Sequence, residues 1–475
     1  MQVHRFISGS FRSTSLFLLS FTPPSPESGS ASIEHLSTVP ANGPHQYIAQ
    51  RGDRVYTTSW ALPPSLSCWS VEGENVSLVG EVPITATSSY ISIPPPYTHI
   101  YSMGGPTGEI HAVDPQMGAF GEKVQEVLFV KEEELEGTDK TRKALTKQRY
   151  GSHAIEISVD GLAFVPVLGT NSIEMYTLSH PSSTFSSSQR HLTHIHSHPS
   201  PRPSDGPRHL LVHPNGKRLY VVTEHTNYLD VYSIHPTSSP PSLTHLNSVS
   251  IIPTDLRPNP HDFRGDTLAL HPPTPSNPSP SHIFATTRGA RSGVRGWMGV
   301  WELDGEGDLI KPEEGDSVQP SSPSPVETSK DPDIGNVHRY ETPTSGGKAN
   351  AISLLLKRSS LSSSSHPTSL EFDTQPPQNS RRHAQMPLVP PPFEANPPVE
   401  ANTTTDAGEE QDGLWILLTD DCGGKDEADE EREGCGAGVR VLDWTRGEGV
   451  RGVVAEWPSH GHEDMRGGSH AVWLD

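Results

Sequence analysis

The amino-acid sequence predicts an all-β fold, a seven-bladed β-propeller that carries long loop inserts. One observation is a unit of three short strands and two tight turns in fewer than 30 residues, at 206–234. A second is the recurrence of this unit at 153–178. A third is that a first-strand pattern, SHAVWLD at 469–475, has no strands after it, whereas LFLLSF at 16–21 stands alone. Repeated short sheets with unmatched strands at the two ends are typical of a closed propeller.

The unit at 206–234 is defined by its turns and by the types of residue in its strands. The strand at 209–213 is followed by Pro-Asn-Gly-Lys, with glycine available for positive φ. RLYVVT at 218–223 is rich in β-branched and aromatic residues, and YLDVYSI at 228–234 alternates apolar and polar residues. The unit at 153–178 matches it element by element, from HAIEIS through an Asn-bearing turn to SIEMYTL.

The other blades show the same pattern of strands and turns, one after another along the chain. Their first strands begin near residues 45, 88, 266 and 348. Six complete blades and one divided between the two ends of the chain give seven. Closing the ring with strands from both ends removes free sheet edges, which otherwise promote aggregation.

Composition indicates one large domain interrupted by low-complexity segments. The chain has 475 residues, only 32% of them hydrophobic, with 47 prolines and 41 glycines. We therefore expect a single propeller domain over 1–475, with disordered loop inserts at 179–205, 312–336, 357–412 and 422–437. Loops tolerate such insertions at small free-energy cost.

The formal net charge of −22 argues against a nucleic-acid partner. Three cysteines do not form a disulfide framework. The chain has no run of 18 apolar residues, so we expect no membrane span. The apolar run at 16–21 is too short for a signal peptide, which favours a strand and a cytoplasmic protein. The oligomeric state cannot be predicted from the sequence.

Histidines are concentrated in the segment expected to be the first insert, at His191, His194, His196 and His198. Such a run can bind a metal, but no predicted strand or helix fixes it, and a solvated loop is favoured. We therefore predict neither a metal nor an organic cofactor.

Several motifs together carry a family resemblance. GPRHLLVHPNGKRLYVVTEHTNYLDVY, FATTRGA followed by RGWMGVWEL, TPTSGGKANAIS, LTDD and the terminal HAVWLD occur in that order. With them the chain resembles the lactonase-type seven-bladed propellers, and among these the fungal 3-carboxy-cis,cis-muconate cyclases. The resemblance is strongest over 152–303 and over the last third.

The resemblance implies a site in a central funnel. Its catalytic residues fall on His153, Arg208, Glu224 and Arg288, and the two arginines also bind substrate. Asn350 and His470 begin inner strands at positions equivalent to His153, so we expect them to line the same channel and to contact substrate.

The implied activity is cofactor-independent lactonisation of 3-carboxy-cis,cis-muconate in aromatic catabolism, the β-ketoadipate pathway. A small tricarboxylate suits arginine, whose guanidinium stays charged and grips a carboxylate with two bonds. A preorganised arginine also stabilises the enolate-like charge that develops. His153 or Glu224 can supply the proton.

Alternatives remain open at this point. A hydrolase of the 6-phosphogluconolactonase type has the same fold, and a non-catalytic scaffold would use its inserts as interaction sites. Arg208 and Glu224 can also form a structural ion pair, and His153 can cap a strand. Strict alternation along the strand would turn His209 away from Arg208 and into the core.

Overall fold

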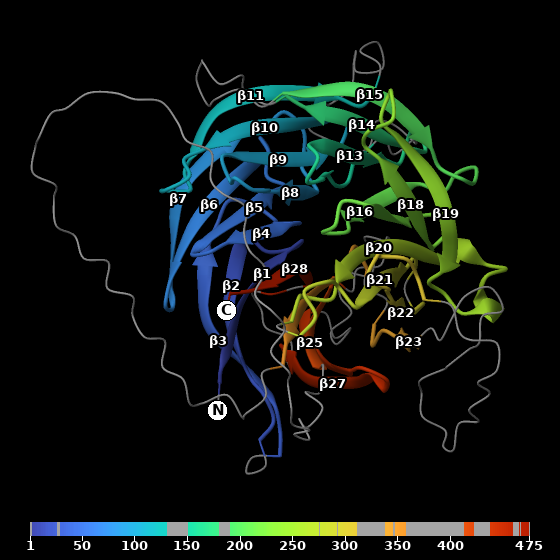
Figure 1. Ribbon diagram of the computed structural model, residues 1–475. Helices are drawn as coiled ribbons and strands as arrows, with labels where there is room; N and C mark the ends of the chain where they lie inside the picture. The colour runs from blue at the N-terminus through green and yellow to red at the C-terminus, as the bar shows by residue number, and fades with distance from the viewer. Residues whose placement is uncertain are drawn as a thin grey trace, which may run out of the picture.

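The computed structural model describes residues 2–25, 29–130, 151–179, 191–274, 276–291, 293–310, 338–344, 347–357, 413–421, 438–458, 465 and 467–474. Over these residues the chain forms seven four-stranded antiparallel sheets. Figure 1 shows the sheets arranged as blades around a central axis, with β4, β8, β16, β20 and β28 nearest the middle. The predicted seven-bladed propeller is confirmed.

Blades 1 to 3 follow one another along the first half of the chain. Blade 1 contains β4 (Ile48–Arg51), β5 (Arg54–Ser59), β6 (Ser65–Glu72) and β7 (Asn75–Pro83). Blade 2 contains β8 (Tyr90–Ser92), β9 (His99–Gly104), β10 (Thr107–Val113) and β11 (Phe120–Leu128). Blade 3 contains β12 (Glu156–Ile157), β13 (Leu162–Val167), β14 (Ser172–Leu178) and β15 (Leu192–Pro199).

Blades 4 to 6 continue the ring. Blade 4 contains β16 (Pro207–Val212), β17 (Arg218–Thr223), β18 (Tyr228–His235) and β19 (Ser242–Ser250). Two short 3-10 turns, η1 (Thr254–Leu256) and η2 (Pro260–Asp262), precede blade 5, which contains β20 (Phe263–Leu270), β21 (His282–Gly289), β22 (Trp297–Glu302) and β23 (His338–Glu341). Blade 6 contains β24 (Asn350–Leu356), β25 (Gly413–Asp420), β26 (Gly438–Thr445) and β27 (Gly449–Trp457).

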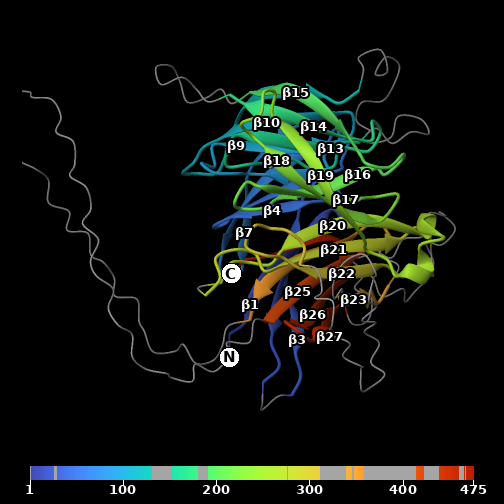
Figure 2. The same cartoon turned by 45° about the vertical axis from the view of Figure 1, so that its right-hand side comes forward.

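Blade 7 closes the ring with strands from both ends of the chain. β28 (Gly468–Trp473) is its innermost strand and pairs with β1 (His4–Ser10), followed by β2 (Ser15–Thr22) and β3 (Ser32–Pro40). Both chain ends therefore lie beside this blade in the two views (Figure 2). The sequence predicts one N-terminal strand at 15–21, whereas the structure has three strands there, β1 to β3.

Apolar side chains are buried between the blades. Seven hydrophobic clusters occur, each shared by two neighbouring sheets, and together they run around the whole ring. A middle strand thus packs on both faces, which explains why LAFVPV in β13 and GLWILLTD in β25 are buried throughout. The central channel is positioned by this side-by-side packing.

The outer strands differ most from the sequence analysis. The segment 179–205, expected to be a disordered insert, contains β15, so that expectation is wrong for this part of it. The sequence of β15, LTHIHSHP, exposes one face to solvent and therefore carries polar histidines, which give it the composition of a loop. The expected inserts 312–336 and 422–437, and 358–412 after Lys357, lie outside the described residues.

No helix within these ranges is both long and apolar enough to span a bilayer.

Candidate active site

A pocket of about 370 Å³, part of it open to solvent, lies at the centre of the ring. Every blade contributes to its lining, mainly from residues in or just before its innermost strand, and Phe11 comes from the turn after β1. Phe11, Tyr47, Tyr90, His153, Arg208 and His470 are among the lining residues. The pocket combines aromatic walls with a few charged groups, as binding sites for small molecules commonly do.

Irregular strand pairing brings adjacent residues of three inner strands into this lining. β16 pairs with β17 regularly except at Arg208, where the register shifts. β20 shifts against β21 at Asp266 and Thr267, and β28 shifts against β1 around Ser469 and His470. A β-bulge turns a side chain away from strict alternation. In each case the bulge lets two neighbouring residues line the pocket.

Two arginines and two carboxylates form a buried cluster beside the pocket. Arg208 Nε lies 3.3 Å from Glu224 Oε2, and Arg208 Nη1 pairs with the carboxylate of Asp266. Arg288 Nη2 lies 3.5 Å from Glu224 Oε1, and its Nε lies 3.9 Å from Asp266 Oδ1. Arg288 Nη1 also donates to the Gly347 carbonyl at 3.0 Å. The formal charges of the four side chains cancel, and both guanidiniums are held rigidly.

The remaining predicted residues take different positions. His153 and His470 line the pocket together with Arg208. Asn350 is fully buried, and its side-chain amide donates to the Thr287 carbonyl at 2.9 Å. Its backbone N–H donates to the carboxylate of Asp266. The structure thus places Asn350 behind Asp266, in contact with blade 5, while the neighbouring Ala349 and Ala351 line the pocket.

Two pocket residues were missed or misplaced by the sequence analysis. Asp266 was not singled out, although aligning TLALHP at 267–272 with HLLVHP at 209–214 puts it at the position of Arg208. His209 was expected in the core but lines the pocket. The bulge at Arg208 is the physical reason, because it breaks the alternation on which that expectation depended.

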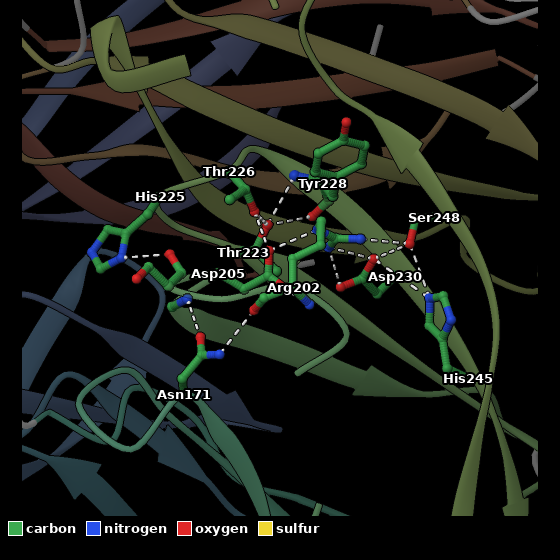
Figure 3. Close-up of polar contacts among 12 residues, drawn as sticks. Asn171, Arg202, Asp205, Thr223, His225, Thr226, Tyr228, Asp230, His245 and Ser248 are labelled. Carbon is green, nitrogen blue, oxygen red and sulfur yellow. Dashed lines mark hydrogen bonds and ion pairs between the residues drawn. The ribbon is translucent and has the colours of Figure 1, made fainter. Parts of the chain in front are cut away.

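A second polar network supports blade 4 (Figure 3). Arg202 donates to Asp205 Oδ1 at 2.7 Å, to Asp230 at 2.7 and 2.8 Å, and to Ser248 Oγ at 2.8 Å. Thr226 donates to the other side of the network, at Asp205 Oδ1. Both aspartate side chains are fully buried, so the pairing satisfies charges that would otherwise be costly.

This network fixes the two segments that carry the charged cluster. The backbone N–H of Glu224 donates to the Gly206 carbonyl at 2.7 Å, and that of His225 donates to the Asp205 carbonyl at 3.0 Å. The loop before Arg208 and the turn after β17 are therefore bonded to each other. The distance between Arg208 and Glu224 follows from this contact.

A buried glutamate lies at the edge of an aromatic wall of the pocket. The Tyr47 ring stacks on His470 with centroids 4.2 Å apart, and Tyr90 lies 4.4 Å from Tyr47. The Tyr90 hydroxyl donates to Glu156 Oε1 at 2.6 Å. Burial raises the pKa of Glu156 to about 7, although the hydrogen bond from Tyr90 lowers it.

No group of three or more histidine, cysteine or acidic side chains suited to a metal ion occurs in the described part of the chain. Three of the four clustered histidines lie on the outer strand β15, and His194 Nε2 contacts Glu174 Oε2 at 2.8 Å. Cys68 is buried and unbridged, and the other two cysteines fall outside the described residues.

The fold and the pocket define a class: a seven-bladed propeller with a central pocket lined by Arg208 and Asp266. Glu224 and Arg288 contact this pair but are not among the lining residues. A family model described as "Lactonase, 7-bladed beta-propeller" matches residues 10–266, more than half of the chain. The chain therefore belongs to the lactonase family of seven-bladed β-propellers, as its motifs predicted.

Individual relatives are distant. Muconate cycloisomerase 1 of Cutaneotrichosporon cutaneum is 25% identical over 358 residues, 73% of this chain and 82% of the relative. Carboxy-cis,cis-muconate cyclase of Neurospora crassa is 26% identical over 159 residues, 32% of this chain and 35% of the relative. The periplasmic gluconolactonase of Pseudomonas aeruginosa has a structure with a TM-score of 0.49 and 15% identity, covering 65% of this chain and 81% of that one.

Proposed function

We propose that this protein is a cofactor-independent cycloisomerase that closes a lactone ring within 3-carboxy-cis,cis-muconate. The observation that carries the proposal is the pair of arginines held by Glu224 and Asp266 at a central pocket. Two relatives are named for muconate or carboxymuconate ring closure, which supports the same reaction class.

Arg208 and Arg288 bind and orient the carboxylates of the substrate. Their guanidiniums are already fixed by ion pairs, so little conformational freedom is lost on binding. Ring closure is intramolecular, and holding the attacking carboxylate near the double bond supplies much of the acceleration.

One carboxylate oxygen adds to the conjugated double bond and forms the C–O bond. The π bond of the double bond breaks, and its electron pair moves onto the conjugated carboxylate, giving an enolate-like dianion that the guanidiniums stabilise. A proton then adds to the adjacent carbon, so that a trianion and one proton give a lactone that carries two negative charges.

We assign delivery of this proton to His153. Its ring lines the pocket, whereas both carboxylate oxygens of Glu224 face the two arginines. A histidine titrates near neutral pH, which suits a general acid that is recharged from solvent after each turnover. Glu224 then serves to hold the arginines.

Purified protein should be assayed with 3-carboxymuconate, muconate, gluconolactone and 6-phosphogluconolactone. We expect loss of the conjugated-diene absorbance with 3-carboxymuconate. The Arg288→Ala variant should lower kcat/KM by about 10²–10³-fold, the usual effect of removing a transition-state donor. Arg295→Ala is the matched control, because Arg295 lies seven positions further along and its side chain is 56% exposed.

Hydrolysis of a sugar lactone without any ring closure would overturn the proposal in favour of a lactonase. Equal values of kcat/KM for wild type and Arg288→Ala would show that Arg288 takes no part in the reaction. Circular dichroism and thermal unfolding of each variant distinguish lost chemistry from lost structure.

A further inference from the structure

His209 is held in one tautomer by the backbone of the neighbouring blade. The side chain is 6% exposed and lines the pocket beside Arg208. The backbone N–H of Leu268 donates to His209 Nδ1 at 3.0 Å. A peptide N–H can only donate, so Nδ1 carries no proton and a neutral ring must carry its proton on Nε2.

His470, on β28 of blade 7, is held in the same way. The backbone N–H of Ile48 donates to His470 Nδ1 at 3.3 Å, and the ring stacks on Tyr47 with an interplanar angle of 14°. His470 is also 6% exposed. Its proton is therefore on Nε2 as well, and its ring plane is fixed.

Both rings are neutral at physiological pH. Burial lowers the pKa of His209 to about 3, with further contributions from the charge of Arg208 and from His470. Burial lowers the pKa of His470 to about 4, and the N–H of Ile48 that donates to Nδ1 also favours the neutral ring. Asp266 is the acidic group that lines the pocket with them, and it is paired with Arg208.

The Nε2 atom of His209 is buried without a protein hydrogen-bond partner within the described ranges. A buried N–H donor of this kind is costly unless an acceptor reaches it. His470 lies close enough to His209 for the two rings to interact electrostatically. Two preorganised N–H donors thus line one pocket, and both belong to bulged inner strands.

We propose that His209 and His470 are a pair of neutral Nε2–H donors that bind the substrate carboxylate on which negative charge accumulates during ring closure. This assignment rests on the proposed function. The pair transfers no proton: it donates two hydrogen bonds, while the proton for the carbon comes from His153. A neutral imidazole gives up its N–H proton with great difficulty, so it stabilises an enolate oxygen without neutralising it.

The kinetic test compares substitutions that remove the donor with one that keeps it. His209→Leu and His470→Leu should each lower kcat about 10²-fold and change KM much less, because the hydrogen bonds strengthen in the transition state. His209→Gln, which returns an N–H near the Nε2 position, should recover at least about tenfold of the loss. His111→Gln is the matched control, since His111 is a buried neutral histidine on β10 and not one of the pocket-lining residues.

A readout independent of turnover uses protein labelled with 15N at histidine. The two resonances are assigned by their loss in His209→Gln and His470→Gln. We expect both rings to be neutral Nε2–H tautomers that do not titrate between pH 6 and 8, and their Nε2–H signals to shift when benzene-1,2,4-tricarboxylate is added.

Nδ1–H tautomers, titration above pH 6, or wild-type kcat in both leucine variants would overturn the donor assignment while the proposed function stands. If wild-type protein neither turns over carboxymuconate nor binds the tricarboxylate, the proposed function fails, and the donor pair fails with it.

Discussion

Arg202 shows how much one side chain contributes to the geometry of the site without reaching it. Its guanidinium binds two aspartates whose side chains are fully buried, Asp205 and Asp230. The ring of Tyr228 lies against the same guanidinium, 4.2 Å from its carbon. Asp205 connects through its backbone to the turn that carries Glu224. The charge of Arg202 therefore stabilises both the blade and the spacing of the pocket residues.

We expect Arg202→Met to lower the free energy of unfolding by about 3 kcal/mol, because two buried carboxylates lose their counter-charge. Urea denaturation measures the change. Lys217→Met is the control: Lys217 pairs with Glu306 at the surface, where both side chains are more than half exposed, and such pairs contribute less than ~1 kcal/mol. Equal losses for the two variants would contradict the network's role.

The residues of the charged cluster could be found from the sequence only in part. Arg208, Glu224 and Arg288 follow recognisable motifs, and the structure brings them together. Asp266 lies within β20 and belongs to no distinctive motif, and its ion pairs with two arginines form between neighbouring blades. A pairing between residues far apart in the chain leaves no local pattern.

At the scale of single elements, the bulges of the inner strands decide which side chains line the pocket. The strand pattern predicted the position of the strands well, because buried strands are continuous apolar runs bounded by turn residues. It did not predict the bulges, since a one-residue register shift changes which side chains share a face without changing composition. The outer strand β15 was missed for another reason: most of its residues face water, so its sequence resembles a loop.

Gly265 on β20 shows how closely blades 4 and 5 approach. A Cβ atom there would lie 2.1 Å from the Thr223 carbonyl oxygen, and the Gly265 N–H donates to the Glu224 carbonyl at 3.0 Å. We expect Gly265→Ala to cost ~1–3 kcal/mol of stability and to reduce turnover, because backbone next to Glu224 must move. Thermal unfolding and the carboxymuconate assay measure both.

Gly80→Ala provides the matched control on strand β7, where an added Cβ would meet no atom within 4 Å. This variant should be as stable as wild type within ~0.5 kcal/mol and fully active. A Gly265→Ala variant that behaves in the same way would show that the contact between the blades is not tight.

At the scale of the whole molecule, residues 358–412 interrupt blade 6 between β24 and β25. Leu356 pairs with Leu414, and the Lys357 N–H donates to the Gly413 carbonyl at 2.9 Å, so the two ends of this segment already meet. Replacing 358–412 by Asn-Gly should preserve the hairpin and raise stability by roughly 2–3 kcal/mol, since loop closure becomes cheaper. Turnover should be unchanged if the ring alone is the enzyme.

Denaturant unfolding and the carboxymuconate assay on this deletion variant provide the measurement. A stable, folded variant without turnover would show that the segment contributes to the site. A non-catalytic scaffold would instead lose its function when 358–412 is removed, because that alternative assigns the function of the protein to the inserts.

Acid should lower the free energy of unfolding of the whole propeller. Four buried histidines have a pKa lowered to about 3 or about 4 by burial: His45, His111, His209 and His470. In the unfolded chain these rings take up protons near pH 6.5, so the free energy of unfolding falls as pH drops from about 6.5 towards 4. Glu156 and Asp420 act in the opposite sense: burial raises their pKa values to about 7 and about 6, and the folded state keeps their protons.

The effect of the four histidines is larger than that of the two carboxyl groups, so we expect a net loss of stability between pH 7 and pH 4. Urea denaturation across that range measures it. His45→Gln should reduce the slope by up to one proton near pH 5–6. A stability that rises steadily on acidification would contradict this balance.

The position of β28 in blade 7 has a consequence for how the protein is made. During synthesis β1, β2 and β3 emerge from the ribosome before blades 1 to 6. Their inner neighbour β28 emerges only after all of those blades have been made. His470 arrives with that strand. Translation that stalls before codon 468 would thus leave blade 7 without its innermost strand and the pocket without Ser469 and His470.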